Sequence, residues 1–164
     1  MDTLVIRQAN NTDLLAAHEV ERKAYNEAEA ASLERFEERL EKFSDGFLLA
    51  ELGGKIVGIV NSATLDKEDI SDEELKEMIG HVPGGKNIVI FTFAILPEFQ
   101  GKGISKPLMD EFIKRSKESG KEKILLICKD TLVDYYKKYG FINLGKSKST
   151  FAGVEWIEMS LSLK

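Results

Sequence analysis

The stretch from Asn87 to Ser105, NIVIFTFAILPEFQGKGIS, decides the fold of this chain. Residues 87–95 are apolar and rich in β-branched and aromatic side chains, which predicts a buried strand. A helical pattern, KPLMDEFIKRS, follows the stretch directly. Because Pro107 is tolerated only in a first turn, this helix must begin close to Ile104. A glycine–lysine–glycine triplet therefore stands between a strand and a helix.

This triplet lies where a helix N-terminus can hold an anion. The first turn of a helix presents about four unpaired backbone N–H groups and a partial positive charge. Gly101 and Gly103 let these groups approach an anion closely, and Lys102 adds a full charge. The pattern predicts a pyrophosphate site at the start of the helix; a plain strand-to-helix turn is the alternative.

Two other glycine motifs resemble nucleotide-binding loops but lack residues, or the order of elements, that such loops need. GHVPGGKN, residues 80–87, resembles a nucleoside-triphosphate loop, but it ends in Asn87 and precedes its strand instead of following one. The dinucleotide fingerprint G-x-G-x-x-G needs a third glycine where Lys106 stands. Neither nucleotide-binding fold is expected.

Composition bounds the class of protein. The 164 residues, 43% hydrophobic and 31% charged, fit one soluble domain over residues 1–164, and no apolar run approaches the ~18 residues that span a membrane. A net charge of −5 argues against nucleic acid as a partner. A single cysteine, Cys128, argues against disulfides and a metal site and fits the cytoplasm. No secretory signal is expected in MDTLVIRQAN.

The other segments alternate between strand and helix patterns. We expect strands over residues 3–9, 46–52, 55–65, 123–128 and 154–163, and helices over 12–25, 32–43 and 131–139. Thr12 is expected to cap its helix, and Ser71 with Glu74 forms a capping box. The acidic segment 66–77 is either a solvated helix or a lid over a site. The order predicts one mixed α/β domain.

These elements resemble the GNAT superfamily of acyl-CoA-dependent N-acetyltransferases. QGKGIS, residues 100–105, matches the family signature Q/R-x-x-G-x-G/A after a strand, except that Ser105 replaces the final glycine or alanine. HVPGG before the central strand and LLICKDTLVDYYKKYGF near the end are similar to the arylalkylamine (serotonin) N-acetyltransferase branch. The similarity to that branch covers roughly residues 73–141.

The resemblance implies a mixed central sheet, splayed between its fourth and fifth strands and flanked by helices. Acetyl-CoA would be the cosubstrate, with its pantetheine arm in the splayed gap and its pyrophosphate on the glycine loop. A small-molecule amine would attack the thioester directly. The residues expected to bind the cofactor are Phe93, Ala94, Ile95, Gln100, Gly101, Lys102, Gly103, Ile104, Ser105, Lys129 and Tyr136.

The resemblance also assigns the proton transfers. Tyr136 matches the tyrosine of the F/Y-Y-x-K/R-x-G-F motif and would protonate the leaving thiolate; a packing role is the alternative. The branch's two strand histidines fall at Val89 and Phe91, which cannot accept a proton. His81 of the HVPGG turn is the favoured base, and a histidine that only orders its loop is the alternative.

Several alternatives stay open. Glu27 and Glu29 are the reserve candidates for the base, because this region walls the substrate site in the family. The acceptor is a small amine or, alternatively, a protein or peptide. A GNAT domain that binds CoA without transferring anything is the competing class, favoured by the missing strand histidines and opposed by Tyr136. A homodimer is compatible with the sequence.

Overall fold

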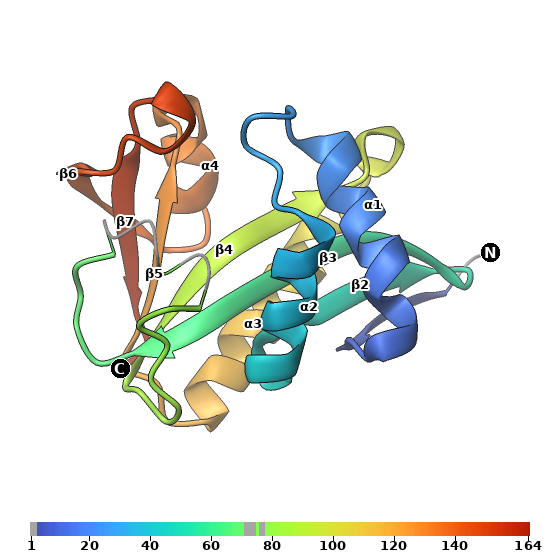
Figure 1. Ribbon diagram of the computed structural model, residues 1–164, viewed down its shortest axis with the longest axis horizontal. Helices are drawn as coiled ribbons and strands as arrows, with labels where there is room; N and C mark the ends of the chain where they lie inside the picture. Colours follow the sequence, from blue (N-terminus) through green and yellow to red (C-terminus); the bar gives the residue numbers. More distant parts are fainter. Residues whose placement is uncertain (1–2, 71–74, 76–77) are drawn as a thin grey trace.

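One mixed β-sheet organises residues 3–70, 75 and 78–164, the part of the chain that the computed structural model describes. Seven strands within these residues lie in the order β1-β2-β3-β4-β5-β7-β6 (Figure 1). They are β1 (Leu4–Gln8), β2 (Leu48–Leu52), β3 (Lys55–Leu65), β4 (Asn87–Ile95), β5 (Lys123–Cys128), β6 (Ile142–Lys146) and β7 (Ile157–Ser162). The helices are α1 (Leu14–Ala24), α2 (Leu33–Lys42), α3 (Ser105–Glu118) and α4 (Val133–Lys137). None of these helices has the length and apolar composition needed to cross a bilayer.

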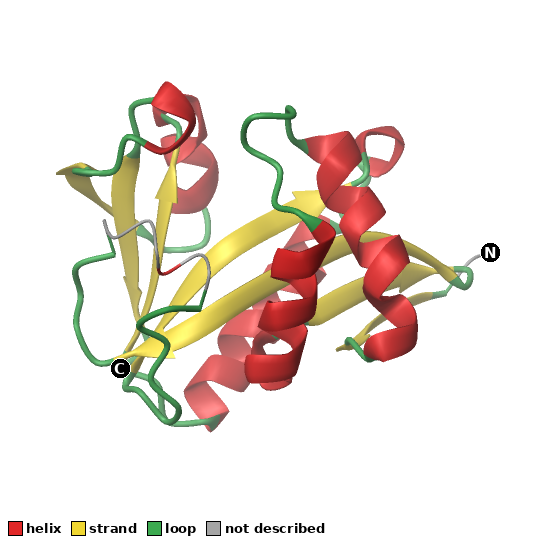
Figure 2. Cartoon of the chain, viewed as in Figure 1, coloured by secondary structure: helices red, strands yellow, loops and turns green. Residues whose placement is uncertain are grey.

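Helices cover both faces of the sheet. α1 and α2 lie in front of it in Figures 1 and 2, and α3 lies behind it. Each helix buries an apolar stripe, including Phe36 of α2 and Leu108 and Phe112 of α3. Ser32 caps α2 and accepts a hydrogen bond from the Arg35 N–H at 3.2 Å. These layers confirm the predicted mixed α/β fold.

The sheet opens between its two parallel strands. β4 and β5 pair only where Asn87–Val89 lie opposite Lys123–Leu125. Beyond Val89 the two strands diverge (Figure 1), and β4 continues to Ile95 paired with β3 but not with β5. β5 pairs instead with β7 along its whole length. This geometry confirms the predicted splay and leaves one edge of β4 without a neighbouring strand among the described residues.

The start of the first helix differs from the sequence prediction. Asn10, and not Thr12, is the cap: its side chain accepts from the Thr12 N–H at 3.0 Å, and Asp13 accepts from the Asn10 N–H at 2.9 Å. Arg7 of β1 donates two bonds of 2.7 Å to the Asp13 carboxylate. This tertiary contact holds Asp13 at the end of a short 3-10 turn, η1 (Asn11–Asp13), so that α1 begins at Leu14.

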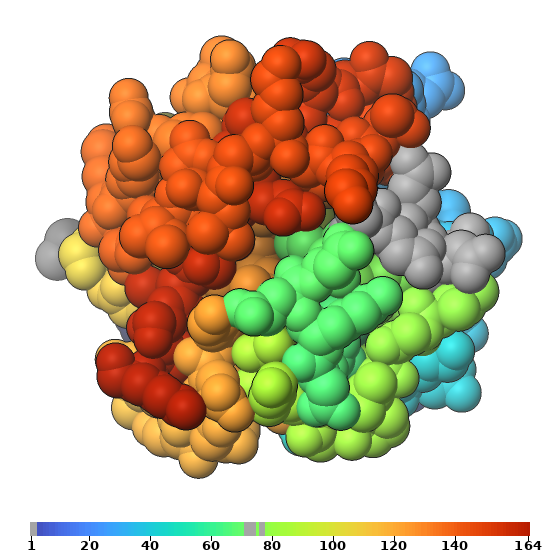
Figure 3. All heavy atoms as spheres, turned by 90° about the vertical axis from the view of Figure 1, so that its left-hand side faces the viewer, coloured from blue at the N-terminus to red at the C-terminus, as the bar shows by residue number. Residues whose placement is uncertain are grey.

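The C-terminal region contains a strand that the sequence did not suggest. β6 carries exposed Ile142 and Leu144 and bends at Gly145, so it lacks the alternating pattern of a half-buried strand. In Figure 3 the C-terminal segments, orange and red, gather above the green segment that follows β3. The expected capping box of Ser71 and Glu74 lies outside the described residues.

The Asp13 contact makes stability depend on pH. Hydrogen bonds from Arg7 lower the pKa of Asp13 in the folded protein. The contact therefore contributes its full stability above the unfolded-state pKa of ~3.9, and this stability is lost as pH falls through the lower folded-state pKa. We expect Asp13→Asn to lower the free energy of unfolding by about 1–2 kcal/mol at pH 7. Urea denaturation should show the difference shrinking below pH ~4; an equal difference at pH 3 would contradict this account.

Candidate active site

The loop after β4 crosses the open edge of the sheet to reach α3. Gln100 ties the loop back to the strand, because its Nε2 donates to the Ile95 carbonyl at 3.0 Å. Gly101 and Gly103 have φ of +73° and +78°, and a β-carbon at either would meet no heavy atom within 4 Å. Both positions therefore need glycine for their positive φ, and the space above the loop is open. No side chain of the described residues caps α3, so its first N–H groups face this space.

A cavity of about 460 Å³, here called the loop cavity, lies between the loop, β4 and α4. Its lining residues are Ala24, Tyr25, Phe93, Ala94, Ile95, Phe99, Gln100, Gly101, Gly103, Ile104, Ser105, Leu132, Tyr135 and Tyr136. Nine of the eleven residues expected to bind the cofactor are among them. Lys102 is exposed beside the Phe99 ring instead, and Lys129, which is partly exposed, lines a third and smaller space.

The open edge of β4 presents backbone groups to this cavity. Leu96 N–H donates to the Val57 carbonyl of β3 at 2.8 Å, and residue pairs across an antiparallel ladder alternate between bonded and non-bonded. This alternation turns the N–H and C=O of Phe93 and Ile95 away from β3, toward the splayed gap. The Phe93 carbonyl accepts from the Tyr25 hydroxyl at 3.2 Å, in agreement with this orientation. Both N–H groups therefore point into the gap.

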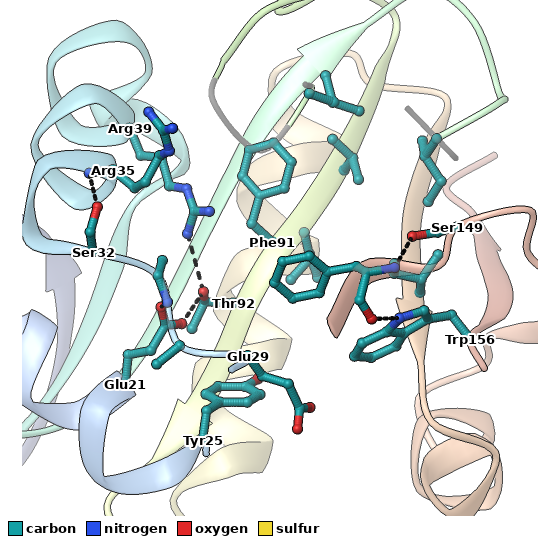
Figure 4. A pocket seen from close by; sticks show the side chains of 18 of the residues that line it. Glu21, Tyr25, Glu29, Ser32, Arg35, Arg39, Phe91, Thr92, Ser149 and Trp156 are labelled. Carbon is teal, nitrogen blue, oxygen red and sulfur yellow. Dashed lines mark hydrogen bonds between the residues drawn. The ribbon is translucent and has the colours of Figure 1, made fainter. Parts of the chain in front are cut away.

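A second cavity, of about 340 Å³, lies on the other side of Tyr25 and is here called the arginine cavity (Figure 4). It is lined by Glu21, Tyr25, Ala28, Glu29, Ala30, Ala31, Ser32, Arg35, Arg39, Ile70, Leu75, Val89, Ile90, Phe91, Thr92, Ile127, Ser149, Phe151 and Trp156. The residues come from α1, α2, the segment joining them, the chain after β3, β4, β5 and the chain before β7. The two positions where the related branch has histidines, Val89 and Phe91, are part of this wall.

A smaller space of about 210 Å³, here called the junction, shares lining residues with both cavities. Tyr25 lines all three spaces. Tyr136 lines the junction and the loop cavity, and Glu29 lines the junction and the arginine cavity. The three spaces therefore lie next to one another, with the junction between the loop cavity and the arginine cavity.

Tyr136, the expected proton donor, lines both the junction and the loop cavity. It is 7% exposed, and its ring packs 5.9 Å from Phe141 and 6.3 Å from Phe93. Burial raises its pKa well above the ordinary value of a phenol, so Tyr136 holds its proton at neutral pH. The hydroxyls of Tyr135 and Tyr139 bond to each other instead, at 3.2 Å.

An ion pair that sequence reasoning did not foresee stands at the junction. The Glu29 carboxylate, whose side chain is only 5% exposed, accepts from Lys129 Nζ at 2.9 Å and also from the Asn26 side-chain amide. Lys129, expected on the cofactor, therefore holds a carboxylate between the two cavities. The two residues are 100 positions apart, so no local pattern could reveal the pair. Glu27 lines none of the three spaces.

His81 lies apart from these cavities. Its Nδ1 accepts from the Thr64 N–H at 3.1 Å, and its ring lies 5.4 Å from that of Phe43. Burial lowers its pKa. His81 does not line any of the three spaces, and its role as the base stays a prediction. Among the described residues, no three His, Cys, Asp or Glu side chains gather to hold a metal ion.

A splayed mixed sheet with a glycine loop at its open edge defines the class of fold found in acyl-CoA-binding acetyltransferases. A family model described as "Acetyltransferase (GNAT) domain" matches residues 15–163, and the chain belongs to this family.

Similar proteins agree with this membership. Serotonin N-acetyltransferase of Mesocricetus auratus is 26% identical over 112 residues, which cover 68% of this chain and 53% of that protein. The chain thus spans about half the length of this curated relative. The loading GNATL domain of CurA from Lyngbya majuscula has the same fold, with a TM-score of 0.88, 18% identity and 98% of each chain covered. The acetyltransferase yncA of Salmonella typhimurium, described as putative and solved with its cofactor acetyl-CoA, gives a TM-score of 0.67 at 16% identity, with 98% of this chain and 94% of that chain covered.

Proposed function

We propose that this protein transfers an acetyl group from acetyl-CoA to a primary amine. The observation that carries the proposal is a set of three adjacent spaces that share lining residues. The loop cavity offers backbone N–H groups to a cofactor, the arginine cavity offers room for an acceptor, and Tyr136 and Glu29 stand at the junction between them.

The loop cavity fits the parts of acetyl-CoA. The N–H groups around Gly101 and Gly103 and at the start of α3 would hold the pyrophosphate. The pantetheine arm would lie along the open edge of β4, as an added strand would. The N–H of Phe93 would donate to the thioester carbonyl oxygen and stabilise the negative charge that develops there.

The chemistry requires two proton movements. The amine nitrogen attacks the thioester carbon, the carbon–sulfur bond breaks, and the sulfur leaves as a thiolate. Tyr136 would donate its phenolic hydrogen to that thiolate, and burial, which raises the phenol's pKa, also favours a protonated sulfur. The amine must lose a proton as it attacks, and we assign its acceptance to Glu29 because this carboxylate lines the junction. His81 is the alternative acceptor.

The shape of the arginine cavity favours a small acceptor. It is walled by α1, α2, the segment between them, and the chain around Phe151 and Trp156. A protein or peptide N-terminus is the second candidate acceptor, and CoA binding without transfer is the competing class. Acetyl-CoA consumption with small amines, polyamines and peptides, together with calorimetric binding of CoA, tests these proposals. Binding without turnover on every acceptor would support the competing class.

Gly103→Val tests the placement of the cofactor. A branched side chain would fill the space where the pyrophosphate approaches, so we expect CoA affinity to fall at least ~10-fold. Gly120→Val is the matched control, because Gly120 has φ of +79° and an equally open environment at the far end of α3. Calorimetry should find the loss in the first variant alone. Unchanged affinity in Gly103→Val would place the cofactor elsewhere.

A further inference from the structure

The two larger cavities follow each other along β4. Residues 93–95 of this strand line the loop cavity, and residues 89–92 line the arginine cavity. A pantetheine arm that starts at the glycine loop, after Ile95, would bring its thioester to Phe93. An acyl chain that continued in the same direction would pass from Phe93 toward Phe91. The group that stands at this boundary therefore limits the length of the acyl chain.

Tyr25 stands at this boundary. Among the described residues, it alone lines the loop cavity, the junction and the arginine cavity. Its backbone N–H donates to the Glu21 carbonyl at 2.9 Å where α1 ends, and its hydroxyl donates to the Phe93 carbonyl at 3.2 Å. The side chain is therefore tied to α1 at one end and to β4 at the other. Figure 4 shows the Tyr25 ring below Thr92, at the lower end of the arginine cavity.

The hydroxyl bond places the Tyr25 ring next to the expected position of the reacting carbonyl. The N–H and C=O of one strand residue face the same edge, so both groups of Phe93 face the splayed gap. A thioester oxygen on the Phe93 N–H would thus lie beside the Tyr25 hydroxyl, which is already on the Phe93 carbonyl. Burial raises the pKa of Tyr25, so the phenol keeps its proton at neutral pH and can donate this bond.

We propose, resting on the proposed transferase function, that Tyr25 is a specificity-determining residue that limits the acyl donor to an acetyl-sized group. The ring would face the methyl group of acetyl-CoA, and a longer acyl chain would have to displace it. Displacement would break the bond to the Phe93 carbonyl and crowd the site, which weakens binding. The acceptor amine is not blocked in this way, because a nucleophile approaches a carbonyl carbon from above the thioester plane, whereas the acyl chain extends within that plane.

The experiment compares acetyl-, propionyl-, butyryl- and hexanoyl-CoA with one amine that the parent protein accepts. We expect kcat/KM of the parent to be at least ~10-fold higher for acetyl-CoA than for butyryl-CoA. In Tyr25→Ala the butyryl-to-acetyl ratio should rise at least ~10-fold, because the ring is gone. Tyr25→Phe is the matched control: it keeps the ring and loses only the hydroxyl bond, so its ratio should rise less. Tyr25→Leu, which also lacks the ring, replaces Tyr25→Ala if that variant does not fold.

Binding measurements keep this inference separate from the proposed function. A parent protein that uses butyryl-CoA as well as acetyl-CoA, or an unchanged ratio in Tyr25→Ala, would overturn the inference and leave the transferase proposal intact. An equal rise in Tyr25→Phe and Tyr25→Ala would also overturn it, because the ring would then not set the limit. If no amine is acylated with any donor, the transferase proposal fails, and calorimetry with acetyl-CoA and butyryl-CoA decides the inference. Weaker binding of butyryl-CoA that is restored in Tyr25→Ala would support it, and equal binding in the parent would overturn it.

Discussion

Tyr136→Phe is expected to lower kcat for acetyl transfer by ~10²-fold or more, with CoA affinity nearly unchanged. The substitution removes one oxygen and keeps the ring that packs against Phe93 and Phe141. Without the phenol, the thiolate must leave without a proton donor in a site that is shielded from water. Stopped-time assays at saturating acetyl-CoA would give kcat, and calorimetry would give the affinity for CoA.

Tyr139→Phe is the matched control for this prediction. Tyr139 lies two residues after the end of α4, and its hydroxyl bonds to Tyr135 and Ser105, yet it does not line the loop cavity. Its loss should therefore affect transfer much less. If Tyr136→Phe weakened CoA binding as much as turnover, the residue would have a packing role. Equal losses in both variants would lead to the same conclusion.

The sequence was sufficient for the parts of the site that are local in the chain. A strand, two glycines and a helix with Pro107 in its first turn specify the glycine loop within residues 87–107. Backbone conformation follows from these residue types, because only glycine adopts φ near +75° without strain. The splayed sheet followed from family resemblance, and pairing limited to Asn87–Val89 confirms it.

The acceptor side could not be predicted in the same way. Arg39 meets Thr92 across 53 positions, and Lys129 meets Glu29 across 100. Neither pair leaves a periodic or spaced pattern, because each depends on how distant elements pack. The same reason explains where α1 begins, because Arg7 of β1 forms an ion pair with Asp13 just before this helix. The family resemblance indicated that the region of Glu27 and Glu29 walls the substrate site, while tertiary packing decided which charges face each other.

Glu29→Gln is expected to lower kcat/KM for the amine by ~10²-fold while CoA affinity is kept. A protonated amine has no lone pair with which to attack, so a group near the thioester must take its proton. Glutamine has nearly the same shape as glutamate and can still contact Asn26 and Lys129, but it cannot accept that proton. The rate should be measured from pH 6 to pH 9 with one amine that the parent protein accepts.

Two further variants decide between the candidate bases. Glu27→Gln removes a neighbouring carboxylate that lines no cavity, so it should leave the rate unchanged. His81→Gln removes a histidine whose Nδ1 is occupied by the Thr64 N–H and which lies outside the junction. Retention of the rate and of the acidic limb of the pH profile in His81→Gln, with loss in Glu29→Gln, would assign the proton to Glu29. The reverse result would assign acceptance of the proton to His81, which would then have to act through water because it does not line the site.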